Sequence, residues 1–117
     1  MPAMHEFSIA EALASQVLAH APARARVREV EVRIGALRGI EPDALRMAWD
    51  AVTFGTPMAG ATLALDMLPW SVRCSNCGRE WTSPVPFVSC SCGNETPAPL
   101  GGDELDLMAI TVDEDEG

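Results

Sequence analysis

The chain has 117 residues, which suits one compact domain or a small domain that carries a smaller insert. Its formal net charge of −9 disfavours nucleic acid and anionic membranes as partners, because binding to phosphates needs clustered Lys and Arg. No apolar run approaches the ~20 residues of a membrane span, and the N-terminus lacks the basic and apolar regions of a secretory signal. We therefore predict a cytoplasmic protein.

The N-terminal half is expected to alternate helix and strand. Residues 8–20 are predicted to form a helix, because their apolar residues recur at spacings of three and four. Residues 27–37 are predicted to form a strand, since Val and Ile alternate there with charged residues. A second helix should begin at Glu41 and Pro42, since proline is tolerated in a first turn, and it should end by Gly55.

The C-terminal half contains two further predicted strands, at residues 61–68 and 105–112, on either side of a segment of different character. The first of these strands has an expected inward set of Ala61, Leu63, Leu65 and Met67. Residues 69–99 hold all four cysteines and show no helical period. So short a segment cannot bury a stable core alone, so we expect a separate module that is fixed by a metal.

These elements predict an α+β fold, in which a three-stranded sheet carries two helices on one face. A zinc-ribbon-like module is inserted between the last two strands. The expected domain limits are residues 1–68 and 100–117 for the α/β domain and residues 69–99 for the module.

The four cysteines form two close pairs, Cys74-x2-Cys77 and Cys90-x-Cys92. A glycine follows each pair and allows the backbone to turn, so that each pair can supply half of a tetrahedron of thiolates around zinc. In a reducing compartment a metal is favoured over disulfides. An iron–thiolate electron carrier, disulfides and free thiols remain as alternatives. A zinc site with four cysteine ligands is closed and should be structural.

Two histidines remain to be interpreted. His5 lies just before the first predicted helix, and on spacing alone it is a solvated terminal residue. His20 lies at the end of that helix, where a positive charge is favourable, and is interpreted as structural. The chain has no Gly-rich phosphate loop, serine–histidine constellation or paired carboxylates on a recognisable scaffold, so we do not expect an enzyme.

Several blocks of the sequence resemble the HypA/HybF family of hydrogenase nickel-incorporation proteins. These blocks are Met4-His5-Glu6-Phe7-Ser8-Ile9, Val32-Arg33-Ile34-Gly35-Ala36-Leu37, Gly55-Thr56-Pro57-Met58-Ala59-Gly60-Ala61-Thr62-Leu63, the two cysteine pairs, and Gly102-Asp103-Glu104-Leu105. They occur in the family's order along nearly the whole chain. Two features depart from the family pattern: three residues precede Met4, and only Ser91 separates the second pair of cysteines.

The resemblance implies a nickel metallochaperone. Transferable Ni(II) would bind at His5, with Met4 and Glu6 as secondary candidates, and the four cysteines would hold a structural Zn(II). The implied partners are a hydrogenase-maturation GTPase and the precursor of the [NiFe] hydrogenase large subunit. The alternative is a zinc-ribbon protein-interaction module without nickel transfer.

Overall fold

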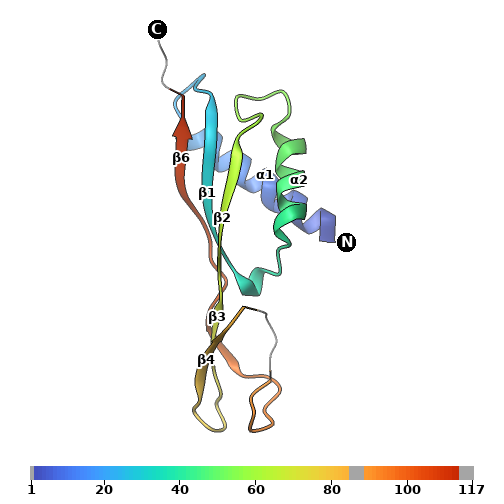
Figure 1. The fold of residues 1–117 in the computed structure, drawn as a ribbon, viewed down its shortest axis with the longest axis vertical. Coiled ribbons are helices and arrows are strands. Elements are labelled where there is room, and N and C mark those ends of the chain that lie inside the picture. The colour runs from blue at the N-terminus through green and yellow to red at the C-terminus, as the bar shows by residue number, and fades with distance from the viewer. Residues whose placement is uncertain (1, 85–88, 114–117) are drawn as a thin grey trace. The chain divides into compact units, whose positions relative to one another are not determined.

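The computed structural model describes residues 2–84 and 89–113, and for residues 2–4 it describes only the backbone (Figure 1). The helices are α1 (Pro2–His20), the short 3-10 helix η1 (Ala36–Arg38) and α2 (Pro42–Thr53). The strands are β1 (Val27–Gly35), β2 (Thr62–Leu68), β3 (Trp70–Arg73), β4 (Glu80–Ser83), β5 (Ala98–Gly101) and β6 (Leu105–Val112). Within the described ranges, none of the helices has the length and apolar character needed to span a membrane.

The chain forms two compact units. The first unit comprises Met1–Val32, Ile40–Leu65 and Leu107–Gly117, and the second comprises Arg33–Gly39 and Asp66–Asp106. The strands form two three-stranded sheets, with the orders β2-β1-β6 and β4-β3-β5.

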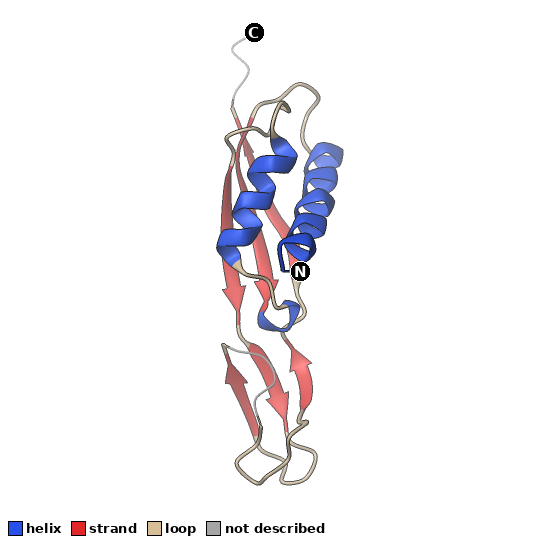
Figure 2. Cartoon of the chain, turned by 90° about the vertical axis from the view of Figure 1, so that its right-hand side faces the viewer, coloured by secondary structure: helices blue, strands red, loops and turns tan. Residues whose placement is uncertain are grey.

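In the first unit, α1 and α2 lie on the same face of the sheet (Figure 2). Their packing follows the predicted apolar stripes, because residues spaced three and four apart share one side of a helix. The buried helical side chains are Ala10, Leu13, Ala14, Val17, Leu45, Ala48 and Trp49. Val30 and Val32 of β1 are buried with them. The indole N–H of Trp49 donates to the carbonyl oxygen of Ala61 at 3.2 Å, which satisfies a polar group inside this core.

In the second unit, the sheet is antiparallel and β3 is its central strand. Val72 lies opposite Trp81 of β4 and opposite Pro99 of β5. Trp70 and Val72 are buried. The carbonyl oxygen of Gly102 accepts the N–H of Leu37 at 2.7 Å, which ties the segment after β1 to the segment after β5. The predicted α+β fold, with two helices on one face of a sheet and a small inserted module, is confirmed.

Three details of the prediction need correction. Helix α1 begins at Pro2 rather than residue 8, since proline is well suited to a first turn. Strand β1 ends at Gly35, and the last predicted strand residues form η1, which is closed by Gly39 in a left-handed conformation with φ of 63°. Met67 was expected to point inward but is 41% exposed.

Candidate metal centres

The four cysteines meet at one end of the second unit. Cys74 follows β3 directly, while Cys77 precedes β4 in the same turn. The Sγ atoms of Cys74 and Cys92 are 3.5 Å apart, and those of Cys77 and Cys90 are 3.6 Å apart. All four sulfur atoms lie within 4.8 Å of one another. The structure therefore brings together the four residues that the sequence predicts as one site.

These distances fit a tetrahedral metal better than disulfides. Four thiolates at about 2.3 Å from zinc would be about 3.8 Å apart, whereas a disulfide would require about 2.0 Å. All four residues are free cysteines. A tetrahedral set of four sulfurs suits zinc or iron. The donor set therefore fits a structural zinc ion, which would hold the two cysteine turns together.

Hydrogen bonds separate the pKa values of the thiols. The side-chain amide of Asn94 is the main cause that lowers the pKa of Cys74 to about 6, and it donates to the Cys74 sulfur at 3.4 Å. The backbone N–H of Asn94 lowers the pKa of Cys92, but hydrogen bonds with Cys74 and Cys90 together with burial raise it to about 11. Without a metal the cluster thus favours a thiolate at Cys74 and a protonated thiol at Cys92. A bound cation would remove the remaining protons.

The second candidate centre is the N-terminal part of α1. His5 has an exposed side chain, whereas Glu6 beside it is only 1% exposed. The Oε2 atom of Glu6 accepts the backbone N–H of Glu41 at 3.0 Å. Within residues 2–84 and 89–113, no hydrogen-bond partner is present for the buried Oε1 atom of Glu6. The side chain of Met4 lies outside what the structure describes.

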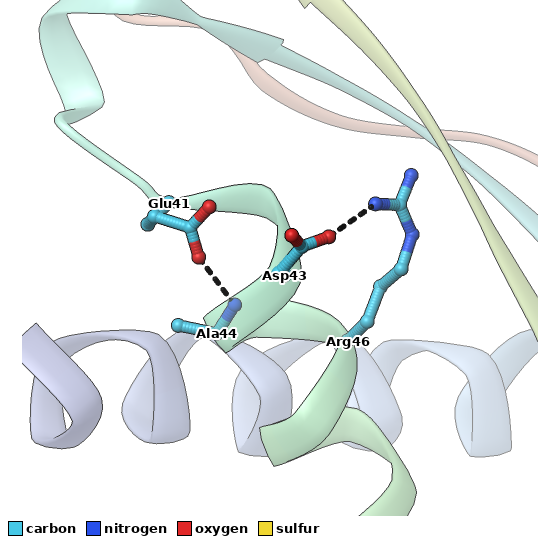
Figure 3. Close-up of polar contacts among 4 residues, drawn as sticks. All are labelled: Glu41, Asp43, Ala44 and Arg46. Carbon is cyan, nitrogen blue, oxygen red and sulfur yellow. Dashed lines mark hydrogen bonds and ion pairs between the residues drawn. The ribbon is translucent and has the colours of Figure 1, made fainter.

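The bond from Glu41 places Glu6 at the start of α2. Figure 3 shows that Glu41 is itself the N-cap of this helix, where its Oε2 atom accepts the N–H of Ala44 at 2.6 Å. One turn along, Arg46 pairs with Asp43 at 3.4 Å. Two carboxylates, Glu6 and Glu41, thus satisfy N–H groups that a helix start leaves unbonded, and both favour the positive end of the helix dipole. Glu6 thereby anchors the turn that carries His5 to α2.

Asn94 was not predicted from the sequence as part of the cysteine site. The sequence signal is its position directly after the glycine that follows the second pair, where a side chain can reach the thiolates. His20 lies at the end of α1, as predicted, with an exposed side chain. Phe87, which we expect to belong to the small apolar lining of the cysteine module, and the acidic residues 114–116, which we expect to form a solvated end, lie outside the described residues.

Comparison with known proteins identifies the family of this chain. A family model described as "Hydrogenase/urease nickel incorporation, metallochaperone, hypA" matches residues 4–112. A "Hydrogenase maturation factor HypA" from Nostoc punctiforme is 39% identical over 111 residues, which cover 95% of this chain and 97% of that protein. Another from Methylocella silvestris is 37% identical over 113 residues, covering 94% of this chain and 100% of that protein.

The fold agrees with these matches. The solution structure of the Ni metallochaperone HypA from Helicobacter pylori matches with a TM-score of 0.59 and 16% sequence identity. The match covers 92% of this chain and 96% of that one. At this identity the likeness concerns the fold. The family match over residues 4–112 includes His5, Glu6 and all four cysteines, and the chain belongs to the HypA family of nickel-incorporation metallochaperones.

Proposed function

We propose that this chain binds Ni(II) through His5 and delivers it during maturation of [NiFe] hydrogenase. One observation carries the proposal: the family match extends from residue 4 to residue 112 and so includes the N-terminal histidine. The exposed side chain of His5 supports this role, because a carrier must give its ion to a partner. A buried histidine would be poorly suited to such a transfer.

The chemistry of the helix start also supports nickel binding. Ni(II) favours square-planar nitrogen ligands, which a histidine ring and neighbouring peptide nitrogens can supply. The first N–H groups of a helix have no acceptor within the helix. The N–H of Met4 lies in the first turn of α1 and so has no acceptor within the helix, which leaves this peptide nitrogen available to a metal ion bound by His5. We propose it as a secondary ligand.

Glu6 is the other secondary candidate. Its Oε2 atom is already bonded to the N–H of Glu41, so a nickel ion would have to reach the buried Oε1 atom. This geometry supports an anchoring role for Glu6 more strongly than direct ligation. We propose that Glu6 holds the turn of α1 that presents His5.

For the cysteines, we propose a structural Zn(II) within a module of residues 69–99, attached to an α/β nickel-binding domain of residues 1–68 and 100–117. A closed set of four thiolates suits a structural ion. The proposed partners are a hydrogenase-maturation GTPase and the hydrogenase large-subunit precursor, with the cytoplasm as the compartment. Membership of a family named for nickel incorporation supports this assignment.

The test is a calorimetric titration of Ni(II) into the zinc-loaded chain. The variant is His5→Ala, and the matched control is His20→Ala, which removes an exposed histidine from the other end of the same helix. We expect His5→Ala to abolish tight nickel binding and His20→Ala to retain it. Equal affinity in the wild type and in His5→Ala would remove the proposed site and favour the zinc-ribbon interaction module instead.

A further inference from the structure

The two cysteine turns are built on one plan. We call residues 74–79 the first knuckle and residues 90–94 the second knuckle. In the first knuckle the N–H of Gly78 donates to the carbonyl oxygen of Cys74 at 2.8 Å, and in the second the N–H of Gly93 donates to that of Cys90 at 3.0 Å. Both glycines have a positive φ, of 76° and 103°, which a residue with a side chain adopts only at a cost.

The residue after each glycine closes its turn in the same way. The N–H of Cys74 donates to the carbonyl oxygen of Arg79 at 2.8 Å. The N–H of Cys90 donates to the carbonyl oxygen of Asn94, also at 2.8 Å. Arg79 and Asn94 therefore occupy equivalent positions in the two knuckles, although the second knuckle has one residue fewer between its cysteines.

The side chains of these two residues cross to the opposite knuckle. The Nδ2 atom of Asn94 donates to the Sγ atom of Cys74 at 3.4 Å. The Nη1 atom of Arg79 donates to the Oγ atom of Ser91 at 3.0 Å, and Ser91 is the single residue between Cys90 and Cys92. Each knuckle is thus hydrogen-bonded by a side chain from the other one.

Arg79 has two properties that suit this position. Its guanidinium carbon lies 5.0 Å from the centroid of the Trp81 ring on β4, a cation–π distance that restricts the side chain. Its positive charge also lies beside a centre that would be doubly negative when four thiolates hold one Zn(II) ion. Outer hydrogen-bond partners of this kind orient metal ligands and contribute to metal affinity.

We propose that Arg79 and Asn94 are reciprocal positioning residues of the metal centre, each fixing the cysteines of the opposite knuckle. Arg79 holds the shortened Cys90–Ser91–Cys92 turn in a ligating geometry through Ser91, and Asn94 stabilises the Cys74 thiolate. This inference rests on the proposed zinc site. On this inference, the second cysteine pair can be one residue shorter than the first because the side chain of Arg79, which is not a metal ligand, holds its turn in place.

The experiment measures zinc release from the full zinc-loaded chain to a chromogenic chelator. The variants are Arg79→Met and Asn94→Ala. The matched control is Arg73→Met, because Arg73 pairs at 2.8 Å with Glu80, which lies outside both knuckles, and its loss removes a positive charge from the same sheet. We expect zinc affinity to fall about 10- to 100-fold in the two variants and to stay within about twofold in the control.

Two further variants separate positioning from general folding. Ser91→Ala removes the acceptor of Arg79, so the double variant with Arg79→Met should bind zinc about as weakly as the more affected single variant. Asn94→Asp keeps the oxygen that accepts the N–H of Thr96 at 3.1 Å, but it removes the donor to Cys74 and adds a negative charge. We expect it to bind zinc more weakly than Asn94→Ala.

Cobalt(II) substitution supplies a spectroscopic readout. The visible d–d bands of the cobalt-loaded chain should shift in Arg79→Met and remain unchanged in Arg73→Met. Zinc release and cobalt spectra of Arg79→Met that match those of Arg73→Met would overturn the inference, as would full rescue of zinc affinity by Asn94→Asp. A wild-type chain that binds no zinc would instead refute the proposed zinc site itself.

Discussion

The link between Glu6 and Glu41 leads to a prediction about how the N-terminal part of α1, the proposed nickel site, is held in place. Replacing Glu6 with alanine removes a carboxylate that is 1% exposed and accepts a backbone N–H at 3.0 Å. Loss of a hydrogen bond to a charged acceptor costs about 1.5–3 kcal/mol, and the lost methylene adds about 0.8 kcal/mol. In the other direction, the variant no longer buries the unpartnered Oε1 atom, and avoiding its desolvation stabilises the fold by about 1–3 kcal/mol.

The balance of the central values predicts that Glu6→Ala lowers the free energy of unfolding by about 1 kcal/mol, or about 4 °C in melting temperature for a chain of this size. Glu6→Gln keeps an oxygen that can accept the N–H of Glu41 and removes the buried charge. We therefore expect its melting temperature to lie within a few degrees of the wild-type value.

The assay is thermal unfolding of the zinc-loaded chain followed by circular dichroism, together with nickel titration of each variant. Glu11→Ala is the matched control, because Glu11 is an exposed glutamate on the same helix. Glu6→Gln should retain nickel binding if Glu6 anchors the turn and His5 is the ligand. Equal melting temperatures for Glu6→Ala and Glu11→Ala would refute the anchoring role, and loss of nickel binding in a stable Glu6→Gln would assign Glu6 as a ligand.

Three further predictions follow from the second unit. Gly35→Ala should destabilise the protein by more than about 3 kcal/mol in denaturant unfolding, because its Cβ would overlap the carbonyl group of Gly102. The control Gly39→Ala, which has open space around it, should cost about 1 kcal/mol. Equal losses of stability in the two variants would contradict this prediction. Zinc binding at pH 7.5 should release at least two protons, from Cys92, whose pKa is about 11, and from Cys77, whose pKa is raised, so affinity should rise with pH. Equal calorimetric enthalpies in buffers of different ionisation enthalpy would contradict this. Cys92→Ser should abolish zinc retention and unfold the module while the α/β domain still melts cooperatively, and loss of that cooperative melt would refute the proposed domain limits.

The helices of the first unit could be predicted because their signals are local. Helix α2 begins at Pro42 after the N-cap Glu41, as the sequence predicts, because both residues satisfy the requirements of a helix start directly. The apolar stripe of α1 was also found, although its first turns were missed. Those turns have no apolar period, and Glu6 is buried there because of its bond to Glu41, a contact between residues far apart in the chain.

The second unit was harder to predict. Strands β3, β4 and β5 have four residues each, which is too short for an alternation of apolar and polar residues to be recognised. The cysteine spacing predicted the four residues of the candidate metal site without these strands. It could not identify Arg79 and Asn94, because their side chains cross between turns and this depends on how the two knuckles face each other.

We propose that this chain carries transferable nickel at His5 and a separate structural zinc on its cysteines. Native mass spectrometry of the chain after loading with both metals tests it most directly. We predict one zinc and one nickel ion per wild-type chain, with His5→Ala losing nickel alone and Cys92→Ser losing zinc. Nickel retained in His5→Ala, or lost together with zinc in every cysteine variant, would contradict the account.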